Sequence, residues 1–367
     1  MAARVAFYAP EAAPILMEPR EAATVARHMI AALRRAGVDV VLASRYTPGS
    51  DMTGSDGTRR ARLGERFAHR IARRIAALPP AERPKLFISL RVNGGAPDLI
   101  GPHLARASGI PYVVIRAGIA ASDPLGTGDG SSVIDLGEGP GSRLPLFVDT
   151  SVYARTPPEP MRPAFRAMVG NGYGLDPGIP WIVAPAAMHA CRRASFQMLA
   201  DALGGLGDRA WQLVVVGDGP DKAAVAEMLF PLGFEHVRLV GSLRGGDLAA
   251  LFAAADLCAW PALGEALALA GLETQAAGLP VVACAGSGAA GYVREGDTGY
   301  LAASGDVDGF ARHVAALIDD DNARRRMGAR ARANTVERHA LEAAAPALAR
   351  ALGLDAPHEI AARGIQA

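Results

Sequence analysis

The chain has 367 residues, of which 50% are hydrophobic and 20% are charged. Such a composition is typical of a globular protein with a well-developed core, and the length favours two domains. The formal net charge of +1 argues against a dedicated nucleic-acid binder, whose binding face needs an excess of basic residues. Cys191, Cys258 and Cys284 form no CxxC pair, so we expect reduced, buried thiols in a cytoplasmic protein and no metal site. No apolar run reaches membrane-spanning length and the N-terminus opens into a strand, so we expect no signal peptide.

The first part of the chain alternates strands with helices. Strands are predicted at 4–9, 38–43, 86–90 and 112–115, and helices at 22–36, 59–78 and 98–108. This alternation predicts a parallel sheet covered by helices. Residues 118–143 hold seven glycines and no convincing helix, so we expect a mobile loop. The domain is then about one strand–helix unit short, either as a natural trimmed variant or through a deletion. Its sheet edge is expected to be exposed or covered by a partner chain.

The helix predicted at 59–78 carries seven arginines, at positions 59, 60, 62, 66, 70, 73 and 74. Phe67, Ile71 and Ile75 form a modest apolar stripe along it. One interpretation is a solvated surface helix. The other is an amphipathic arm that contacts anionic lipid headgroups, which would place the protein at the inner face of a membrane.

The second part of the chain predicts another α/β domain. Leu144 to Thr150 is expected to be the last strand of the first domain, and prolines between 157 and 163 indicate a stiff linker. Further strands are predicted at 181–184, 211–216, 237–240 and 257–260, and helices at 194–203, 221–229, 246–254, 307–318, 321–339 and 341–352. The pattern favours a second Rossmann-like domain. We expect domains at 1–155 and 156–335, with a C-terminal helix and tail at 336–367.

Two carboxylates stand out between Trp260 and Leu301, because Glu265 and Glu273 are separated by seven residues. Glu265 lies before a predicted helix that ends at Gly278, and Glu273 lies in the second turn of that helix. The free amides of the first turn, near Ala268 and Leu269, form a potential anion site. Two glutamates on one helix are commonly solvated surface charges. Carboxylates beside an anion site also suit a ligand whose hydroxyls flank a phosphate.

The whole stretch resembles the donor-site signature of retaining GT-B glycosyltransferases of group 1, similar to glycosyltransferase family 4. The resemblance rests on Glu265 and Glu273, then Ala276-Ala277-Gly278-Leu279-Pro280-Val281-Val282, then Gly296-Asp297-Thr298-Gly299-Tyr300-Leu301. It covers some forty residues in order. It implies an α/β protein of the GT-B fold, with two Rossmann-like domains facing each other across a cleft.

The resemblance also implies roles for individual residues. Glu273 would hold the ribose hydroxyls of the nucleotide, and Glu265 would face the donor sugar as the catalytic residue. The backbone of Gly241, Ser242 and Leu243 would frame the base. Enzymes of this kind need no bound metal and no cofactor beyond the nucleotide-sugar donor, because side chains and a helix terminus neutralise the diphosphate.

The chain departs from the family pattern where cations are expected. Pro185, Ala186 and Ala187 stand where the family has an arginine, and the nearest replacements are Arg192 and Arg193. Arg193 is favoured as the cation for the diphosphate because it immediately precedes a predicted helix. Both arginines are equally well explained as solvated surface side chains. The loop after the first predicted strand lacks the glycines that the family has there. Arg20 is the residue of this loop that could contact an anion.

The sequence therefore predicts a retaining hexosyltransferase that moves a sugar from a UDP or GDP donor to a glycan or lipid-linked acceptor, as in polysaccharide biosynthesis. A second hypothesis is a catalytically weakened protein of GT-B shape that binds nucleotide or a partner without transfer. A third is a nucleotide-sugar 2-epimerase on the same fold, which the two-glutamate stretch disfavours.

Overall fold

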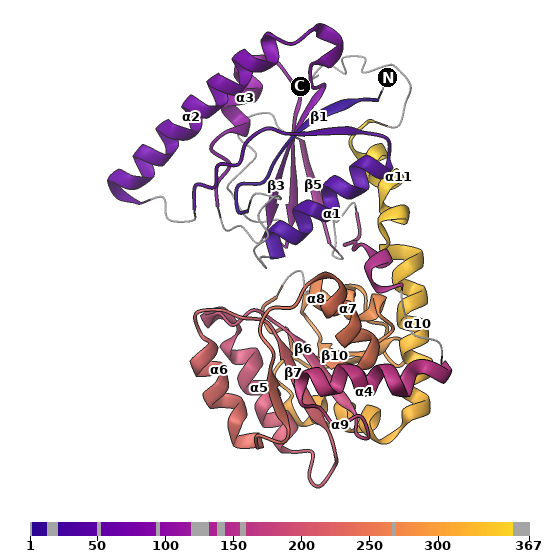
Figure 1. Ribbon diagram of the computed structural model, residues 1–367. Helices are drawn as coiled ribbons and strands as arrows, with labels where there is room; N and C mark the ends of the chain where they lie inside the picture. The colour runs from indigo at the N-terminus through magenta and orange to yellow at the C-terminus, as the bar shows by residue number, and fades with distance from the viewer. Residues whose placement is uncertain are drawn as a thin grey trace. The chain divides into compact units, whose positions relative to one another are not determined.

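A computed structural model describes residues 2–12, 21–49, 53–92, 96–118, 132–137, 144–154, 159–265 and 269–354. The chain divides into two compact units (Figure 1). The first unit comprises Met1–Phe147 together with Leu341–Ala367, and the second comprises Val148–Ala340. The last helix among the described residues therefore belongs to the first unit. Among the helices of the described residues, none is both long and apolar enough to cross a bilayer.

The first unit is built on a parallel five-stranded sheet with the strand order β2-β1-β3-β4-β5. Its strands are β1 (Arg4–Tyr8), β2 (Asp39–Leu42), β3 (Leu86–Val92), β4 (Tyr112–Ala117) and β5 (Ser132–Leu136). Its helices are α1 (Glu21–Arg35), α2 (Gly54–Ala76), the short 3-10 helix η1 (Pro80–Glu82), α3 (Gly101–Ser108) and α11 (Leu341–Ala351). All seven residues of the central strand β3 are buried, as expected for a parallel sheet covered on both faces.

Two helix pairs cover this sheet. Helix α2 packs against α3, and their buried residues join alternate residues of β1, β3 and β4 in one apolar cluster. Helix α11 packs against α1 and is tied to it by the Arg35 Nε–Glu342 Oε1 ion pair of 2.8 Å. The return of the chain's last helix to the first unit thus rests on buried apolar residues of α11, which are Leu341, Ala344, Ala345, Leu348 and Ala349.

The second unit is built on a parallel six-stranded sheet with the order β11-β10-β9-β6-β7-β8. Its strands are β6 (Trp181–Pro185), β7 (Gln212–Val216), β8 (Val237–Leu239), β9 (Leu257–Ala259), β10 (Val281–Cys284) and β11 (Gly299–Ala302). Its α-helices are α4 (Arg162–Tyr173), α5 (Arg193–Gly204), α6 (Lys222–Leu229), α7 (Gly245–Ala254), α8 (Leu269–Ala276), α9 (Val307–Asp319) and α10 (Asp321–His339). Short 3-10 helices are η2 (Thr150–Tyr153), η3 (Glu159–Met161), η4 (Ala190–Arg192), η5 (Phe230–Leu232) and η6 (Gly288–Gly291).

The predicted α/β class and the two parallel sheets are confirmed, but the prediction for residues 118–143 was wrong in part. Residues 132–136 form β5, which pairs in parallel with β4 and is fastened to it by a bidentate Arg116–Asp135 pair of 2.7 and 3.0 Å. The edge of β4 is therefore covered. Glycine-rich flanks concealed a five-residue strand whose side chains alternate in burial. Residues 119–131 and 138–143 lie outside the described residues.

Three further predictions need correction. Residues 144–150 form no regular strand, because only isolated bridges occur there, Leu136 with Leu144 and Val148 with Ala340. The expected linker runs into a helix, since α4 begins at Arg162 with Pro163 in its first turn, where a proline costs no hydrogen bond. The strand β11 was missed, because Gly299 stands at its start and glycine rarely marks a strand.

Glu11 follows β1 and is the most perturbed carboxyl of the first unit's described part. Burial raises its pKa to about 7, an effect that the buried Arg91 of β3 and nearby backbone amides only partly offset. Between pH 4.5, the ordinary pKa of a glutamate, and about pH 7, the folded protein therefore holds a proton that the unfolded chain has lost. The folded state is then favoured at low pH, and its stability falls as the pH rises through this window.

We expect Glu11→Gln to abolish this part of the pH dependence, because an amide carries no ionisable proton. Between pH 5 and pH 8 the wild-type protein should lose on the order of 2–3 kcal/mol of unfolding free energy relative to the variant. Urea unfolding at both pH values measures the difference. A control variant, Glu82→Gln, replaces a half-exposed carboxyl of the same unit and should behave as wild type. Parallel pH profiles for Glu11→Gln and wild type would contradict the assignment.

Candidate functional site

The carboxyl ends of the second unit's strands carry the predicted site residues. In open parallel sheets, the loops at this edge are the usual place for a ligand, because the helices that follow each strand present free amides there. Arg192 and Arg193 follow β6, Gly241 follows β8 and Glu265 follows β9. The site is therefore built from several loops that meet at one edge of one sheet.

The loops after β6 and β7 are joined through their backbones. Ala186 N–H donates to Val216 at 3.0 Å, and Met188 N–H donates to the carbonyl of Asp218 at 3.0 Å. A side chain at Gly219 would collide with the carbonyl oxygen of Met188, so the close approach requires glycine. This ladder holds the loop that leads into Arg192 at a defined place above the sheet edge.

Glu265 is held from two sides. Trp260 Nε1 donates to Glu265 Oε1 at 2.7 Å, and Arg192 Nη2 lies 3.1 Å from Glu265 Oε2. The side chains of Arg192 and Glu265 are only 17% and 12% exposed, so little water screens the ion pair. Both oxygens of Glu265 thus have partners, and the carboxylate has a fixed orientation in its charged form.

The turn that carries Glu265 is strained and well supported. Ala262 has a φ of 55°, and it is the one non-glycine residue with positive φ in the described parts of the chain. Leu263 N–H donates to the buried Ser195 hydroxyl of α5 at 2.9 Å, and Gly288 N–H donates to the Glu265 carbonyl at 2.7 Å. A left-handed alanine costs roughly 1–2 kcal/mol and persists where neighbouring bonds impose it, which is typical of functional sites.

Glu273 has a partner from a distant part of the chain. It lies in the second turn of α8, where the hydroxyl of the buried Tyr153 from η2 is hydrogen-bonded to its carboxylate. Burial raises the pKa of the Tyr153 hydroxyl, and the negative charge of Glu273 raises it further. The Tyr153 ring stacks on Phe252 of α7 with 6.0 Å between ring centroids. Tyr153 is thus a neutral donor fixed beside Glu273.

Arg193 makes a different contact from its neighbour. Its Nε lies 2.9 Å from Asp221 Oδ2, at the start of α6, and its side chain is 51% exposed. The hydrogen bond to Asp221 and the charge of that carboxylate raise the pKa of Arg193 above its ordinary value. The two adjacent arginines therefore contact different loops. Arg192 pairs with the loop after β9, and Arg193 pairs with the loop after β7.

Residues 179–320, which include β6 to β11, match the family model for glycosyl transferases group 1. This segment is a group 1 glycosyltransferase domain.

Curated relatives share parts of the chain. The N-acetyl-alpha-D-glucosaminyl L-malate synthase of Bacillus anthracis is 32% identical over 126 residues, which make up 34% of this chain and 33% of that protein. The D-inositol 3-phosphate glycosyltransferase of Nocardia farcinica is 32% identical over 183 residues, or 46% of this chain and 40% of that protein. The chain thus matches only a third to two fifths of the length of these relatives.

Solved structures resemble the whole chain. The crystal structure of Anabaena HepE in complex with UDP and glucose has a TM-score of 0.70 at 16% identity, covering 96% of this chain and 99% of that chain. Sucrose-phosphate synthase from Thermosynechococcus elongatus has a TM-score of 0.70 at 17% identity, covering 96% and 98%. At such low identity the likeness establishes the fold, and the fold is GT-B.

The group 1 domain brings together some of the predicted site residues and separates others. Glu265 contacts Arg192, whereas Arg193 is paired with Asp221. Leu269 is the first residue of α8 and is buried. In the loop after β8, the Gly241 carbonyl accepts from Gly217 N–H at 2.9 Å, Ser242 is exposed and Leu243 is half-buried. Ala268 and Arg20 lie outside the described residues.

Sequence reasoning missed the residues that orient the two glutamates. Trp260 and Ser195 form hydrogen bonds with the turn that carries Glu265, and Tyr153 forms one with Glu273. Trp260 stands five residues before Glu265, but nothing in that spacing indicates that the indole N–H turns toward the carboxylate. Tyr153 lies outside the matched segment altogether, so no local pattern connects it with Glu273.

The cysteine prediction holds for two of three thiols. Cys258 and Cys284 are buried and free, and burial raises the pKa of the Cys258 thiol to about 12. Cys191, in contrast, is exposed, and it lies in the short helix η4 after β6. Within the described ranges, no three His, Cys, Asp or Glu side chains are grouped so that they could hold a metal ion.

The backbone ladder between the β6 and β7 loops generates a prediction. Gly219→Ala should lower the unfolding free energy by about 1–3 kcal/mol, because the added methyl group meets a backbone carbonyl that cannot rotate away. Gly246→Ala in α7 is the matched control, since nothing lies within 4 Å of its added methyl group. Chemical denaturation compares the two variants. Equal stability for both would show that the loops can separate without cost.

Proposed function

We propose that the protein transfers a sugar from a nucleoside diphosphate sugar to an acceptor hydroxyl with retention of configuration. The observation that carries the proposal is the fixed, charged Glu265, held by Trp260 and Arg192 at the carboxyl edge of a group 1 glycosyltransferase domain. The names of the two relatives, a glucosaminyl malate synthase and an inositol 3-phosphate glycosyltransferase, support it. HepE, which shares the fold, was solved with UDP and glucose.

Each site residue has a role in this proposal. Glu273, with one neutral donor at Tyr153, accepts hydrogen bonds from the ribose hydroxyls. Arg192 supplies positive charge beside Glu265, and we assign the diphosphate to Arg192 rather than Arg193 because Arg192 lies next to the glutamate that faces the donor sugar in this proposal, whereas Arg193 lies beside Asp221. Gly241, Ser242 and Leu243 frame the base. Neutralisation of the leaving group by Arg192 and helix amides makes a metal ion unnecessary in this mechanism.

In the proposed reaction, the bond between the anomeric carbon and the β-phosphate oxygen breaks while the acceptor oxygen approaches from the same face. The departing phosphate oxygen takes the proton of the acceptor hydroxyl, so the products are the glycosylated acceptor and a nucleoside diphosphate. Positive charge develops on the sugar ring in the transition state, and the carboxylate of Glu265 stabilises it. The acceptor is a glycan or a lipid-linked glycan.

Release of UDP or GDP from a panel of nucleotide sugars, without acceptor, tests the proposal. We expect slow release from at least one donor. Glu265→Gln should reduce the release rate about 10–100-fold while the donor still binds, because a neutral amide cannot stabilise the developing positive charge. Donor binding with no release by the wild-type protein would favour the binding-only alternative, which Pro185, Ala186 and Ala187 at the end of β6 already motivate. No binding of any nucleotide sugar would overturn both.

Calorimetry with UDP, GDP and their nucleosides separates the roles of the charged residues. Glu273→Ala should weaken nucleotide and nucleoside alike by about 1–3 kcal/mol, because both contain the ribose. Arg192→Ala should weaken the diphosphate much more than the nucleoside, since only the diphosphate carries the charge. Arg193→Ala is the matched control and should have the smaller effect. A larger loss of diphosphate affinity in Arg193→Ala than in Arg192→Ala would instead assign the diphosphate contact to Arg193.

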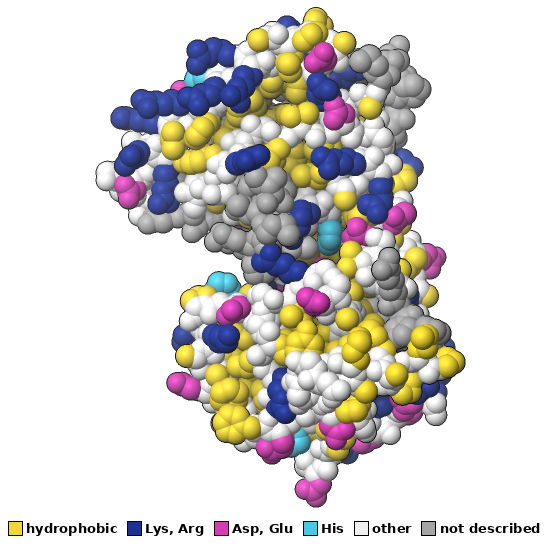
Figure 2. Space-filling view, in the orientation of Figure 1, with side chains coloured by type: hydrophobic (Ala, Val, Ile, Leu, Met, Phe, Trp, Pro, Cys, Tyr) yellow, Lys and Arg dark blue, Asp and Glu magenta, His cyan; other side chains and the backbone are white. Residues whose placement is uncertain are grey.

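The basic helix α2 supports the proposal that the acceptor is linked to a lipid. Arg59, Arg62, Arg66, Arg70 and Arg73 recur at intervals of three and four residues, so they share one face, and all are exposed. Figure 2 shows a row of basic side chains where α2 lies in Figure 1. Its apolar side is already used, because Phe67, Ile71 and Ile75 pack against the core cluster. We therefore propose purely electrostatic contact with anionic lipid headgroups, without insertion of the helix.

Vesicle co-sedimentation tests this contact. The protein should bind vesicles with about 30% anionic lipid at low salt, and a triple change of Arg66, Arg70 and Arg73 to Gln should weaken binding about tenfold or more. Changing Arg326, Arg330 and Arg338 to Gln removes the same charge from α10 and is the control. Equal loss in both triples, or binding to neutral vesicles, would contradict a role for α2.

A further inference from the structure

Tyr153 belongs to a short segment that is fastened to the second unit from several sides. The 3-10 helix η2, which ends at Tyr153, packs against α7 and α8. Asp149 caps the start of η2, because its Oδ1 accepts from Ser151 N–H at 3.1 Å. Just after η2, the carbonyl of Ala154 accepts from Arg332 Nη2 of α10 at 3.1 Å. The backbone that carries Tyr153 therefore has a defined place beside α8.

The aromatic ring of Tyr153 is held by packing. Tyr153 is only 7% exposed, and its ring stacks on the fully buried Phe252 of α7 with 23° between the ring planes. Such a stack involves the two ring faces, so a phenylalanine at position 153 would keep it. The contribution of the hydroxyl group can therefore be separated from the contribution of the ring.

The Tyr153 hydroxyl is a hydrogen-bond donor to Glu273. Burial raises the pKa of the phenol, and the negative charges of Glu273 and Asp149 raise it further, so the phenol keeps its proton. An ionised carboxylate only accepts hydrogen bonds, so the O–H group donates to Glu273. A hydrogen bond from a neutral donor to a charged acceptor is among the stronger ones in proteins.

Glu273 lies at the boundary between the packed and the open side of α8. Its neighbours Leu272 and Thr274 are fully buried, and the Thr274 hydroxyl donates to the Gly271 carbonyl at 2.7 Å. Glu273 itself is half-buried. A glutamate side chain that is only partly packed has several rotamers, and restricting it when a ligand binds costs free energy. The hydrogen bond from Tyr153 favours one rotamer before a ligand arrives.

The orientation of this carboxylate matters for a ribose, which has two adjacent hydroxyl groups. A carboxylate has about four acceptor positions on its two oxygens, so a phenol and ribose hydroxyls can bind it together. A carboxylate that rotates freely can adjust to a 2′-deoxyribose, which offers a single hydroxyl there. A fixed carboxylate cannot adjust, and a site arranged for a hydroxyl discriminates against the analogue that lacks it.

We propose that Tyr153 is a positioning residue, whose hydroxyl fixes the Glu273 carboxylate for the ribose and thereby increases the preference for ribose over 2′-deoxyribose. The inference rests on the ribose-binding role proposed above for Glu273. Tyr153 acts through Glu273 and takes no part in breaking or forming a bond. Its effect is therefore expressed in nucleotide binding alone, without a donor sugar or an acceptor.

Calorimetry with UDP, GDP and their 2′-deoxy analogues tests the role of the hydroxyl. The wild-type protein should bind UDP or GDP about tenfold or more tightly than the corresponding 2′-deoxynucleotide. Tyr153→Phe should reduce this preference about three- to tenfold, because the donor is lost while the ring stack remains. Tyr300→Phe is the matched control, since the Tyr300 ring of β11 stacks on His313 of α9. The control should keep the wild-type preference.

A double-mutant cycle separates positioning from packing. In a Glu273→Ala background, Tyr153→Phe should leave the nucleotide affinity unchanged, because the hydroxyl no longer has a carboxylate to position. An equal loss of affinity in both backgrounds would show that Tyr153 only supports the packing, and would overturn the inference. An unchanged ribose preference in Tyr153→Phe would also overturn it, while leaving the proposed transfer reaction intact.

The wild-type measurements keep this inference distinct from the proposed function. Binding of UDP or GDP without any ribose preference would overturn the inference and the role of Glu273, whereas release from a nucleotide sugar would still support transfer. Failure to bind any nucleotide or nucleotide sugar would overturn both. Denaturation curves establish that Tyr153→Phe is folded, which is expected because the stack on Phe252 is retained.

Discussion

The contact on which the carboxyl edge of the second unit's sheet depends is the one that Trp260 and Arg192 both make with Glu265. A carboxylate with one indole donor and one guanidinium partner, little exposed to water, keeps one orientation. Arg192 reaches it from the loop after β6, whose own path is set by the close backbone contact with the loop after β7. The position of one carboxylate therefore depends on three strands and the spacing between them.

The turn between Trp260 and Glu265 shows how this arrangement is maintained. The left-handed Ala262 is unfavourable by itself, and hydrogen bonds from Leu263 to Ser195 and from Gly288 to Glu265 hold it in place. The strain is local, while its compensation comes from α5 and from η6. Free energy from well-packed elements is thus used to orient a charged group at the sheet edge.

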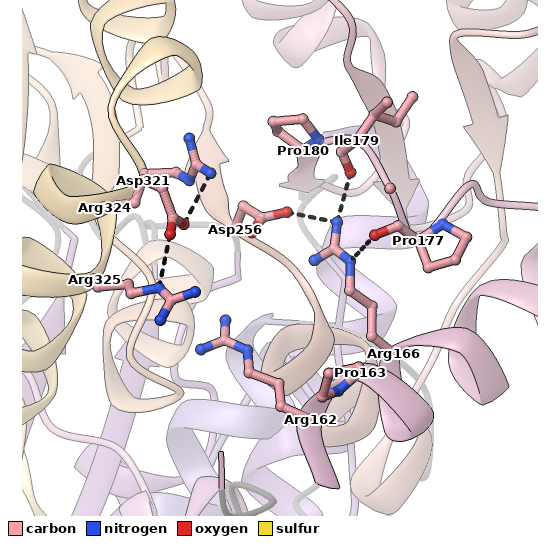
Figure 3. Close-up of a pocket in the computed structure, with 11 residues that line it drawn as sticks. Arg162, Pro163, Arg166, Pro177, Ile179, Pro180, Asp256, Asp321, Arg324 and Arg325 are labelled. Atoms are coloured by element: carbon pink, nitrogen blue, oxygen red, sulfur yellow. Dashed lines mark hydrogen bonds and ion pairs between the residues drawn. The ribbon is translucent and has the colours of Figure 1, made fainter. Parts of the chain in front are cut away.

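The parallel sheet of the second unit presents two edges with different chemistry. Its carboxyl edge carries carboxylates and cations in paired arrangements, as at Glu265 with Arg192 and at Asp221 with Arg193. At its amino edge, Arg166 instead joins the segments that lead into the strands, through the carbonyls of Pro177, Ile179 and Ala254 and an ion pair with Asp256 (Figure 3).

The sequence by itself determined the α/β class, two parallel sheets and most element positions, because hydrophobic periodicity and glycine or proline boundaries are local signals. It also located Glu265 and Glu273 on a loop and a helix. Only the tertiary structure decided that β5 pairs with β4, that Arg192 and not Arg193 contacts Glu265, and that Tyr153 lies beside Glu273. These are contacts between residues far apart in the chain, and no local pattern records them, since their partners are chosen by packing.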